Sequence, residues 1–183
     1  GAATNTPSSS SSSSSSKRPR NTYHRIMINM SILDILYSTW AHIIGSWMMP
    51  EGTAPFSAGN LATCDTQGFF LQLLATAVPW CNGSLSTYYN LVIRLNWNDK
   101  KIEKIEKWLH AVPILLGIVF ASIPMAAKLY VPGTWACWFS NNQFPAGCDS
   151  ADTCVRGWNS WYYFWPVYAI IGIAPIYVLA SMY

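Results

Sequence analysis

Hydrophobic positions fall into four long stretches, which polar, charged or turn-forming residues separate. The stretches cover residues 26–49, 66–93, 108–130 and 158–183. The second reads TQGFFLQLLATAVPWCNGSLSTYYNLVI and contains no Asp, Glu, Lys, Arg or His. At about 1.5 Å per residue, a helix of that length could cross the roughly 30 Å hydrocarbon layer of a bilayer. The pattern predicts an all-α fold, a transmembrane helical bundle with four spans.

Polar and small residues recur at helical spacing within these stretches and share one face of each predicted helix. In the second stretch this arc holds Gln72, Thr76, Pro79, Asn82, Gly83, Ser86, Thr87 and Asn90. In the first it holds Ser31, Asp34, Ser38, His42 and Gly45, and in the third His110, Pro113, Gly117, Ala121, Pro124 and Lys128. Small residues let helices approach closely, and carbonyls freed by prolines need partners inside the protein. We therefore expect these faces to meet in a polar interior, with the apolar faces against lipid.

Asp34 stands near the middle of the first stretch, where a carboxylate costs at least about 2.5 to 3.5 kcal/mol to insert into a bilayer. It should therefore face a partner, water or a cation. Two interpretations stay open. Asp34 is either a packing residue, hydrogen-bonded to a neighbour such as Asn82 or Asn90, or a functional switch or ion site. We group Asp34, Asn82 and Asn90 as candidate interior polar residues.

Charge and cysteine placement predict an orientation. Only 10% of the 183 residues are charged, against about 25% in soluble domains. Nine of the 11 Lys and Arg residues fall in residues 1–25 or 94–107, which the positive-inside rule makes cytoplasmic, whereas residues 50–65 and 131–157 become extracellular loops. Four of the five cysteines lie on this outer side, where disulfides persist and three pairings are possible. We expect a multi-pass protein of the plasma membrane.

Three segments have a local composition that suggests a role. Residues 1–25 carry the serine run 8–16 and a basic cluster, and should be disordered. Asn98 and Asp99 can cap a short amphipathic helix that extends the third span inward. The fourth stretch opens with WNSWYYFWPVY, which is either an aromatic belt at the headgroups or a wall that faces a ligand.

The sequence contains no recognisable pattern of catalytic residues. The three histidines are scattered, and there is no Cys-x-x-Cys pair, no phosphate-binding glycine loop and no nucleophile elbow. We expect no enzymatic activity, no cofactor, no metal and no nucleic-acid partner. The chain begins with Gly1 and its last hydrophobic stretch runs to Tyr183, so we interpret it as a fragment of a longer protein.

The segments RNTYHRIMINMSILDIL, ATCDTQGFFLQL and TWACWFSN resemble parts of a seven-helix G protein-coupled receptor. The similarity is to the slime-mould cyclic-AMP-receptor-like group, whose membrane domain is distantly similar to the secretin-like family. The first segment looks like helix two with its interior carboxylate at Asp34, the second like the outer start of helix three, and the third like the second outer loop. The chain would then supply helices two to five. YYNLVIRLNW lacks the Asp-Arg-Tyr motif of rhodopsin-like receptors, so Arg94 is not assigned that role.

The resemblance implies a function, transmembrane signalling from an unknown extracellular ligand to a cytoplasmic heterotrimeric G protein. It implies a disulfide between Cys64 and Cys137, which leaves Cys148 and Cys154 as a second pair. The residues expected to line the ligand pocket are Gln72, Thr76, Trp138 and Trp161. The candidate contacts of the G protein are Arg94, Lys100, Lys101 and Lys104.

A function from another class remains open on the same residues. A small transporter or ion pathway would use Asp34, His42, His110 and Lys128 as a proton or ion relay. A purely structural four-span protein is a further alternative.

Overall fold

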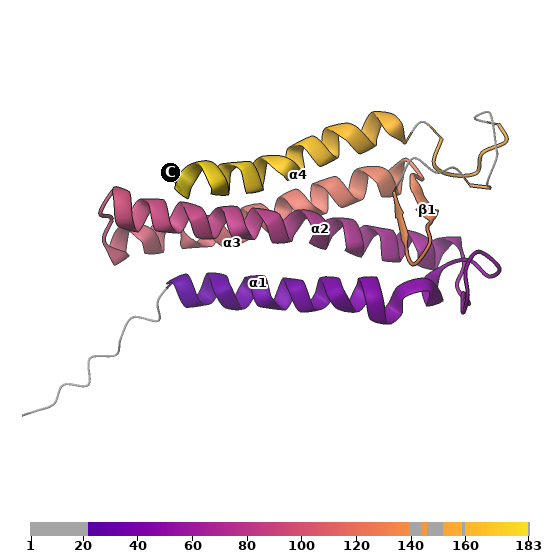
Figure 1. Cartoon of the computed structure of the whole chain (residues 1–183), viewed down its shortest axis with the longest axis horizontal. Helices are drawn as coiled ribbons and strands as arrows, with labels where there is room; N and C mark the ends of the chain where they lie inside the picture. The colour runs from indigo at the N-terminus through magenta and orange to yellow at the C-terminus, as the bar shows by residue number, and fades with distance from the viewer. Residues whose placement is uncertain (1–21, 140–143, 146–151, 159, 183) are drawn as a thin grey trace, which may run out of the picture.

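The computed structural model describes residues 22–139, 144–145, 152–158 and 160–182, with the backbone alone for Asp99, Trp161 and Met182. Four long helices run side by side, and a β-hairpin with its neighbouring loops lies at one end (Figure 1). The helices are α1 (Thr22–Ser38), α2 (Leu61–Tyr89), α3 (Asp99–Ala126) and α4 (Trp161–Met182). Helix α1 continues through a π-helical segment, η1 (Thr39–Ile44), and a 3-10 turn, η2 (Gly45–Met48). Helix α2 continues through a second π-helical segment, η3 (Asn90–Arg94). The mainly helical fold is as predicted.

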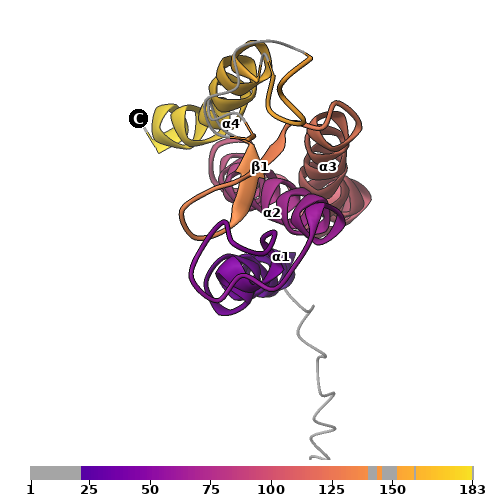
Figure 2. The same cartoon turned by 90° about the vertical axis from the view of Figure 1, so that its right-hand side faces the viewer.

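Helix α2 is the centre of the bundle, because it packs against α1, α3, α4 and both strands. The end-on view in Figure 2 shows the other helices arranged around it. Its apolar face, which we expected against lipid, instead packs on α1, where Leu74, Ala77 and Cys81 form a buried cluster with Leu33. That expectation is wrong because a central helix has protein neighbours on its apolar side as well as on its polar side.

The contact between α2 and α3 uses the small-residue face predicted for the third stretch. Pro113, Gly117, Ala121 and Pro124 are all buried. A Cβ atom on Gly117 would lie 2.6 Å from the carbonyl oxygen of Leu73, so only glycine allows the two backbones to come this close. This part of the predicted interior is confirmed.

The polar arc of α1 does not reach the interior of the described bundle. Ser31, Asp34, Ser38 and His42 are exposed, and so is Asn82 on α2, while Asn90 is half-buried. Asp34 and Asn82 therefore have no protein cover among the described residues, and their interior role stays a prediction. Helix α1 meets α2 through its apolar stripe around Leu33, because burying apolar area is favourable whereas burying an unpaired carboxylate is costly.

Helix α1 begins at Thr22, so residues 22–25, which we expected to belong to the disordered segment, form its first turn. Two contacts hold this turn. Arg25 Nη1 lies 2.8 Å from Glu106 Oε1, and Thr22 Oγ1 donates to Glu106 Oε2 at 3.2 Å. Ile26 is buried beside Tyr88 and Ile102. Residues 1–21 lie outside the described residues.

Capping residues fix where α2 and α3 begin. The side chain of Asn60 accepts hydrogen bonds from the backbone N–H groups of Ala62 and Thr63, and the Thr63 hydroxyl accepts one from Asn60 N. This capping box starts α2 at Leu61, before the predicted second stretch. The side chain of Asn98 accepts from Lys101 N at 3.1 Å. This confirms the predicted cap. Helix α3 then runs unbroken to Ala126, so the amphipathic turn does extend the third helix.

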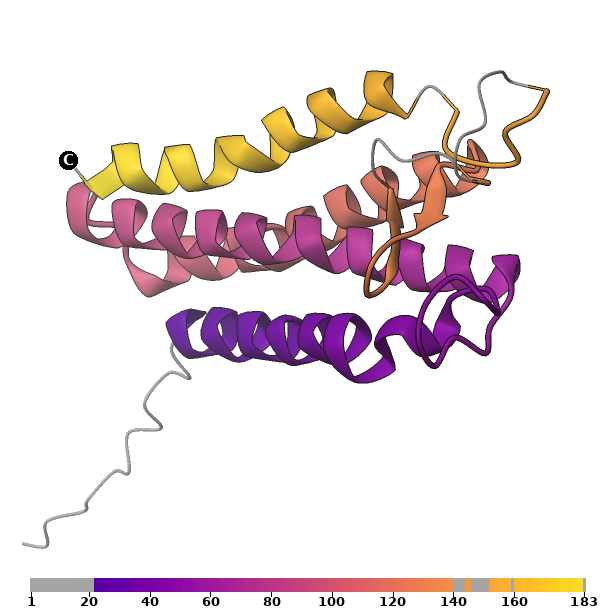
Figure 3. The ribbon, with the colours of Figure 1, turned by 45° about the vertical axis from the view of Figure 1, so that its right-hand side comes forward.

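A two-stranded antiparallel sheet stands inside the segment expected to be an outer loop. Strands β1 (Tyr130–Pro132) and β2 (Cys137–Phe139) pair with Tyr130 opposite Phe139. The hairpin lies against the half of α2 that begins at Leu61, as Figure 3 shows. A Cβ atom on Gly68 of α2 would lie 2.5 Å from the Tyr130 ring, so the ring packs directly on the α2 backbone.

Two helices in the described part of the chain are long and apolar enough to cross a membrane. They cover residues 100–126 of α3 and 162–181 of α4, and the apolar 18-residue window in each has a mean hydropathy of 2.0 and 1.7, respectively. Helix α1 has only 17 residues, and the polar residues of α2 lower its hydropathy. Length and composition thus associate α3 and α4 with a membrane.

Candidate functional sites at the two ends of the bundle

One end of the bundle carries a disulfide between Cys64, in the first turn of α2, and Cys137, in β2. Their Cα atoms are 5.3 Å apart, and both side chains are fully buried. The structure thus contains the pair that the resemblance implied. Cys148 lies outside the described residues, so its pairing with Cys154 stays a prediction.

Gln67 joins three segments at this end, although no pattern in the sequence singled it out. Its Nε2 donates to Gly45 O at 2.5 Å, and its Oε1 accepts from Cys137 N at 2.8 Å. The side chain is fully buried. Gln67 therefore fixes both η2 and the hairpin to the central helix.

Three of the four residues predicted to line a ligand pocket come together one turn further along α2. Trp138 Nε1 donates to Gln72 Oε1 at 2.7 Å, and Gln72 Nε2 donates to Thr76 Oγ1 at 3.2 Å. Gln72 and Thr76 are 0% exposed, so neither has surface left for a ligand, whereas Trp138 is half-buried. The cluster holds the hairpin on α2 instead. The side chain of Trp161 is not among those described.

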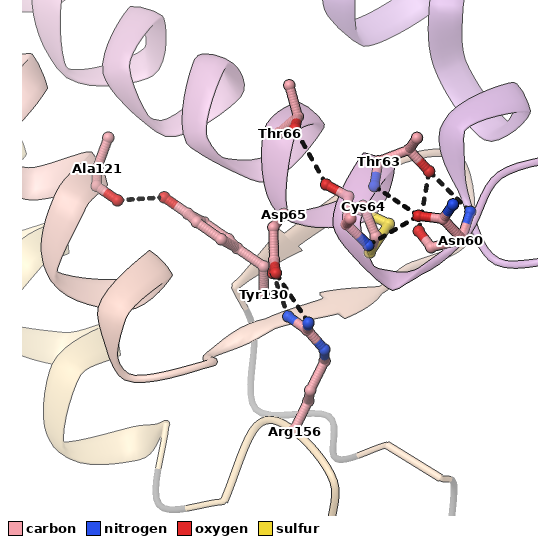
Figure 4. Close-up of polar contacts among 10 residues, drawn as sticks. Asn60, Thr63, Cys64, Asp65, Thr66, Ala121, Tyr130 and Arg156 are labelled. Atoms are coloured by element: carbon pink, nitrogen blue, oxygen red, sulfur yellow. Dashed lines mark hydrogen bonds and ion pairs between the residues drawn. A yellow bond between two sulfur atoms is a disulfide. The ribbon is translucent and has the colours of Figure 1, made fainter.

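A buried ion pair also holds the outer end together. Arg156, which is 8% exposed, binds both carboxylate oxygens of Asp65, with Nη2 2.8 Å from Oδ2 (Figure 4). A two-pronged contact of this kind is geometrically specific. The sequence signal was an acidic residue at the end of one predicted outer loop and an arginine in the other, but nothing in the sequence paired them.

Tyr130 lies in β1, past the end of α3, and reaches back to that helix. Its hydroxyl donates to Ala121 O at 2.8 Å (Figure 4). Burial raises the pKa of this hydroxyl above its ordinary value, so it stays protonated and keeps donating. The strand is thereby fixed between α2 and α3.

The aromatic start of α4 has two different faces. Phe139 of β2 packs against Tyr163 and Phe164, with ring centroids 5.4 and 5.9 Å apart. Tyr162 and Trp165 point outward, at 78% and 54% exposed. One face packs on the hairpin, and the other has the exposure that an aromatic belt requires.

Tyr163 also satisfies a carbonyl that a proline leaves free. Pro124 has no N–H, so the carbonyl of Phe120, four residues earlier, loses its helical donor. The hydroxyl of Tyr163 donates to Phe120 O at 2.5 Å. The expectation that such carbonyls find partners inside the protein is confirmed for this proline.

A cavity of about 440 Å³ opens at the same end, beside the hairpin. It lies between the end of α1, the loop that follows it and the turn of the hairpin. Its residues include Ala41, His42, Phe56 and Trp135, and the His42 ring stacks on Trp135 with centroids 5.7 Å apart. This cavity, with polar and aromatic groups together, is the candidate ligand site on this side. Of the residues predicted to line a ligand pocket, Gln72, Thr76 and Trp138 are not among the described residues that line this cavity.

The opposite end of the bundle has a cavity of about 400 Å³ where α2 passes into η3. It is lined by Ser86, Tyr89, Asn90, Ile93, Arg94 and Ser181. The hydroxyls of Ser86 and Ser181 hydrogen-bond across it. Arg94, Lys100, Lys101 and Lys104, the predicted contacts of a G protein, are all exposed, and Arg94 is the one that lines the cavity.

The four residues of the alternative ion relay are not brought together. His110 and Lys128 are 18 positions apart on α3 and the turn after it, which corresponds to about 27 Å along a helix. Asp34 and His42 are exposed on the far side of α2. Within the described residues, no three His, Cys, Asp or Glu side chains gather as a metal site.

No protein-family model matches the chain, and no curated protein sequence matches it significantly. The geometry of the two ends, together with the sequence resemblance, is therefore the basis for a functional proposal.

Proposed function

We propose that the chain forms helices two to five of a G protein-coupled receptor, which signals from an extracellular ligand to a cytoplasmic heterotrimeric G protein. The observation that carries the proposal is the position of α2. A disulfide ties one end of this central helix to a hairpin that lies over it, and its other end borders an open cavity. One rigid element thus connects a closed, cross-linked end with an open one.

The charges of the two ends support an orientation. The open end carries Arg94 and the exposed lysines of α3, whereas the closed end carries the disulfide. By the positive-inside rule the open end is cytoplasmic, and a disulfide belongs on the outside. All four helices cross the membrane in this proposal. Helix α2 is less apolar because much of its surface meets protein rather than lipid.

The proposed ligand binds in the outer cavity, against His42 and Trp135. The hairpin that carries Trp135 is held on α2 by the hydrogen-bonded cluster of Gln72, Thr76 and Trp138. A ligand that binds one arrangement of the helices better than another shifts the population toward that arrangement. Because α2 touches every other helix, such a shift would reach the cavity around Arg94, where the G protein would bind.

Binding of a G protein tests the cytoplasmic part of this proposal. The chain is reconstituted in phosphatidylcholine vesicles and its binding of a purified heterotrimer is measured by co-flotation. We expect Arg94→Glu to weaken binding about tenfold or more, because it reverses the charge at the cavity. Lys128→Glu is the matched control, since Lys128 is also exposed but lies at the opposite end. Equal binding by both variants, or none by the parent chain, would contradict the proposal.

Side-specific labelling tests whether α3 crosses the membrane, as the four-span topology requires. Lys100→Cys and Thr134→Cys place thiols on exposed residues at the two ends. In sealed vesicles of uniform orientation, a membrane-impermeant maleimide should label one of them from outside and the other only after the vesicles are opened. Labelling of both from the same side would rule out this topology.

A further inference from the structure

The first turn of α1 is joined to α3 through one carboxylate, which the proposed function does not use. Glu106 of α3 is 9% exposed. Its Oε1 lies 2.8 Å from Arg25 Nη1, and its Oε2 accepts a hydrogen bond from Thr22 Oγ1 at 3.2 Å. The contact lies at the end of the bundle where α1 and α3 begin (Figure 1). Two side chains of α1 thus depend on a single acceptor group of α3.

This first turn can open without disturbing the core. No side chain in residues 22–25 is fully buried, whereas Ile26, the next residue, is. The Arg25 side chain is 52% exposed, and a salt bridge exposed to this degree contributes little to stability. Helix ends also open more readily than helix middles. The Thr22 hydroxyl is therefore accessible to another protein while the rest of α1 stays in place.

Basic residues stand on both sides of Thr22 in the sequence. They are Lys17, Arg18 and Arg20 before it and Arg25 after it. Residues 12–32 contain no Asp or Glu, so the segment is positively charged and complements an acidic groove. None of the serines in residues 8–16 has a basic residue before it. A serine/threonine kinase whose substrate groove is acidic is therefore the partner whose chemistry fits Thr22.

We propose that Thr22 is a phosphorylation site for such a kinase, and that the modification releases the first turn of α1 from α3. Thr22 Oγ1 attacks the γ-phosphorus of ATP, its proton passes to a carboxylate of the kinase, and ADP leaves. The new phosphate carries a charge of about −1.5 to −2 at pH 7 and stands beside the Glu106 carboxylate, which repels it.

Arg25 completes the exchange of partners. It lies three positions after Thr22, so the two side chains share a face of α1. A guanidinium binds a phosphate through two parallel hydrogen bonds, and Arg25 therefore leaves Glu106 for the phosphate. Glu106 then loses both of its partners on α1. The site rests on one part of the proposed function, the orientation that exposes this end to the cytoplasm and its ATP, and it requires neither a ligand nor a G protein.

Phosphorylation of the purified chain tests the site. The 183-residue chain in detergent micelles is incubated with ATP and the catalytic domain of protein kinase C, and phosphopeptides are mapped by mass spectrometry. We expect phosphate on Thr22. Arg20→Glu should slow this modification about tenfold, because it reverses a charge that the acidic groove reads. Lys128→Glu makes the same kind of change at an exposed residue of the opposite end and should not slow it. No phosphate on Thr22, or equal rates for the two variants, would overturn the proposal.

A distance measurement tests the release. Spin labels are attached through His24→Cys and Lys104→Cys, both at exposed positions, and pulsed electron paramagnetic resonance measures their separation. Phosphorylation should shift the distribution to longer distances. Glu106→Gln should reduce this shift, because a neutral amide does not repel a phosphate. Glu103→Gln alters an exposed carboxylate on the same helix and should shift like the parent. An unchanged distance after full phosphorylation would refute the release, and failure of G-protein binding would leave both measurements unaffected.

Discussion

At the scale of single residues, polar groups in this bundle hold backbone together more than they face a ligand. Gln72 is the plainest example. The helical pattern placed it on the polar arc of α2, and it does lie there, but its side chain is fully covered by Trp138 from the hairpin. A sequence can assign a residue to a face of a helix. It cannot say what fills the space opposite when the partner is 66 positions away.

Tyr163→Phe should destabilise the bundle by roughly 1 to 3 kcal/mol, because the carbonyl of Phe120 that Pro124 leaves free then has no donor from Tyr163. Thermal unfolding in detergent micelles, followed by circular dichroism, measures the change. Tyr162→Phe removes the same hydroxyl from a side chain that is 78% exposed and should leave the midpoint unchanged. Equal midpoints for the two variants would refute the role given to Tyr163.

At the scale of elements, periodicity predicted the helices well and their partners less well. The small-residue face of α3 packs on α2 as expected, because close approach of backbones is possible only where side chains are small. The orientation of α1 was not predictable from its own pattern. A helix with one apolar and one polar side fits either a polar interior or an apolar one, and the contact of Leu33 with α2 decides between them. The hairpin was also missed, because its strands have three residues each and leave no clear alternation.

Gly68→Ala tests how closely the hairpin packs on α2. The added Cβ would sit 2.5 Å from the Tyr130 ring, so the strand must move, at a cost of roughly 1 to 3 kcal/mol. Urea unfolding monitored by tryptophan fluorescence would report it. Gly172→Ala on α4 meets no atom within 4 Å and should be neutral or slightly stabilising, since alanine favours helix. A Gly68→Ala variant as stable as the parent would mean that Tyr130 does not pack as described.

At the scale of the whole molecule, the four stretches with little or no charge and the separation of cysteines from basic residues predicted four helices with two unlike ends. Their arrangement around α2 could not be read from the sequence, since each stretch is long and mostly apolar and none is marked as central. The disulfide was implied by resemblance alone, because four outer cysteines allow three pairings.

The double variant Cys64→Ala and Cys137→Ala should lose roughly 4 kcal/mol of stability, because the bond closes a loop across 73 positions of the chain. Denaturant unfolding with and without reductant measures the loss, and reductant should affect the parent more than the variant. Cys81→Ala serves as the comparison, since Cys81 is a free buried cysteine. If the double variant unfolds at the same denaturant concentration as the parent, the cross-link contributes little to stability.

The central place of α2 has a consequence for which changes the chain tolerates. Of its residues only Ala62, Phe70, Asn82 and Tyr89 are exposed, so nearly every position along it touches another part of the fold. In a library of all single substitutions, α1 and α4 should each show a permissive stripe at every third or fourth position. In α2 this periodic pattern should be absent, and substitutions should be poorly tolerated at almost every position from one end of the helix to the other.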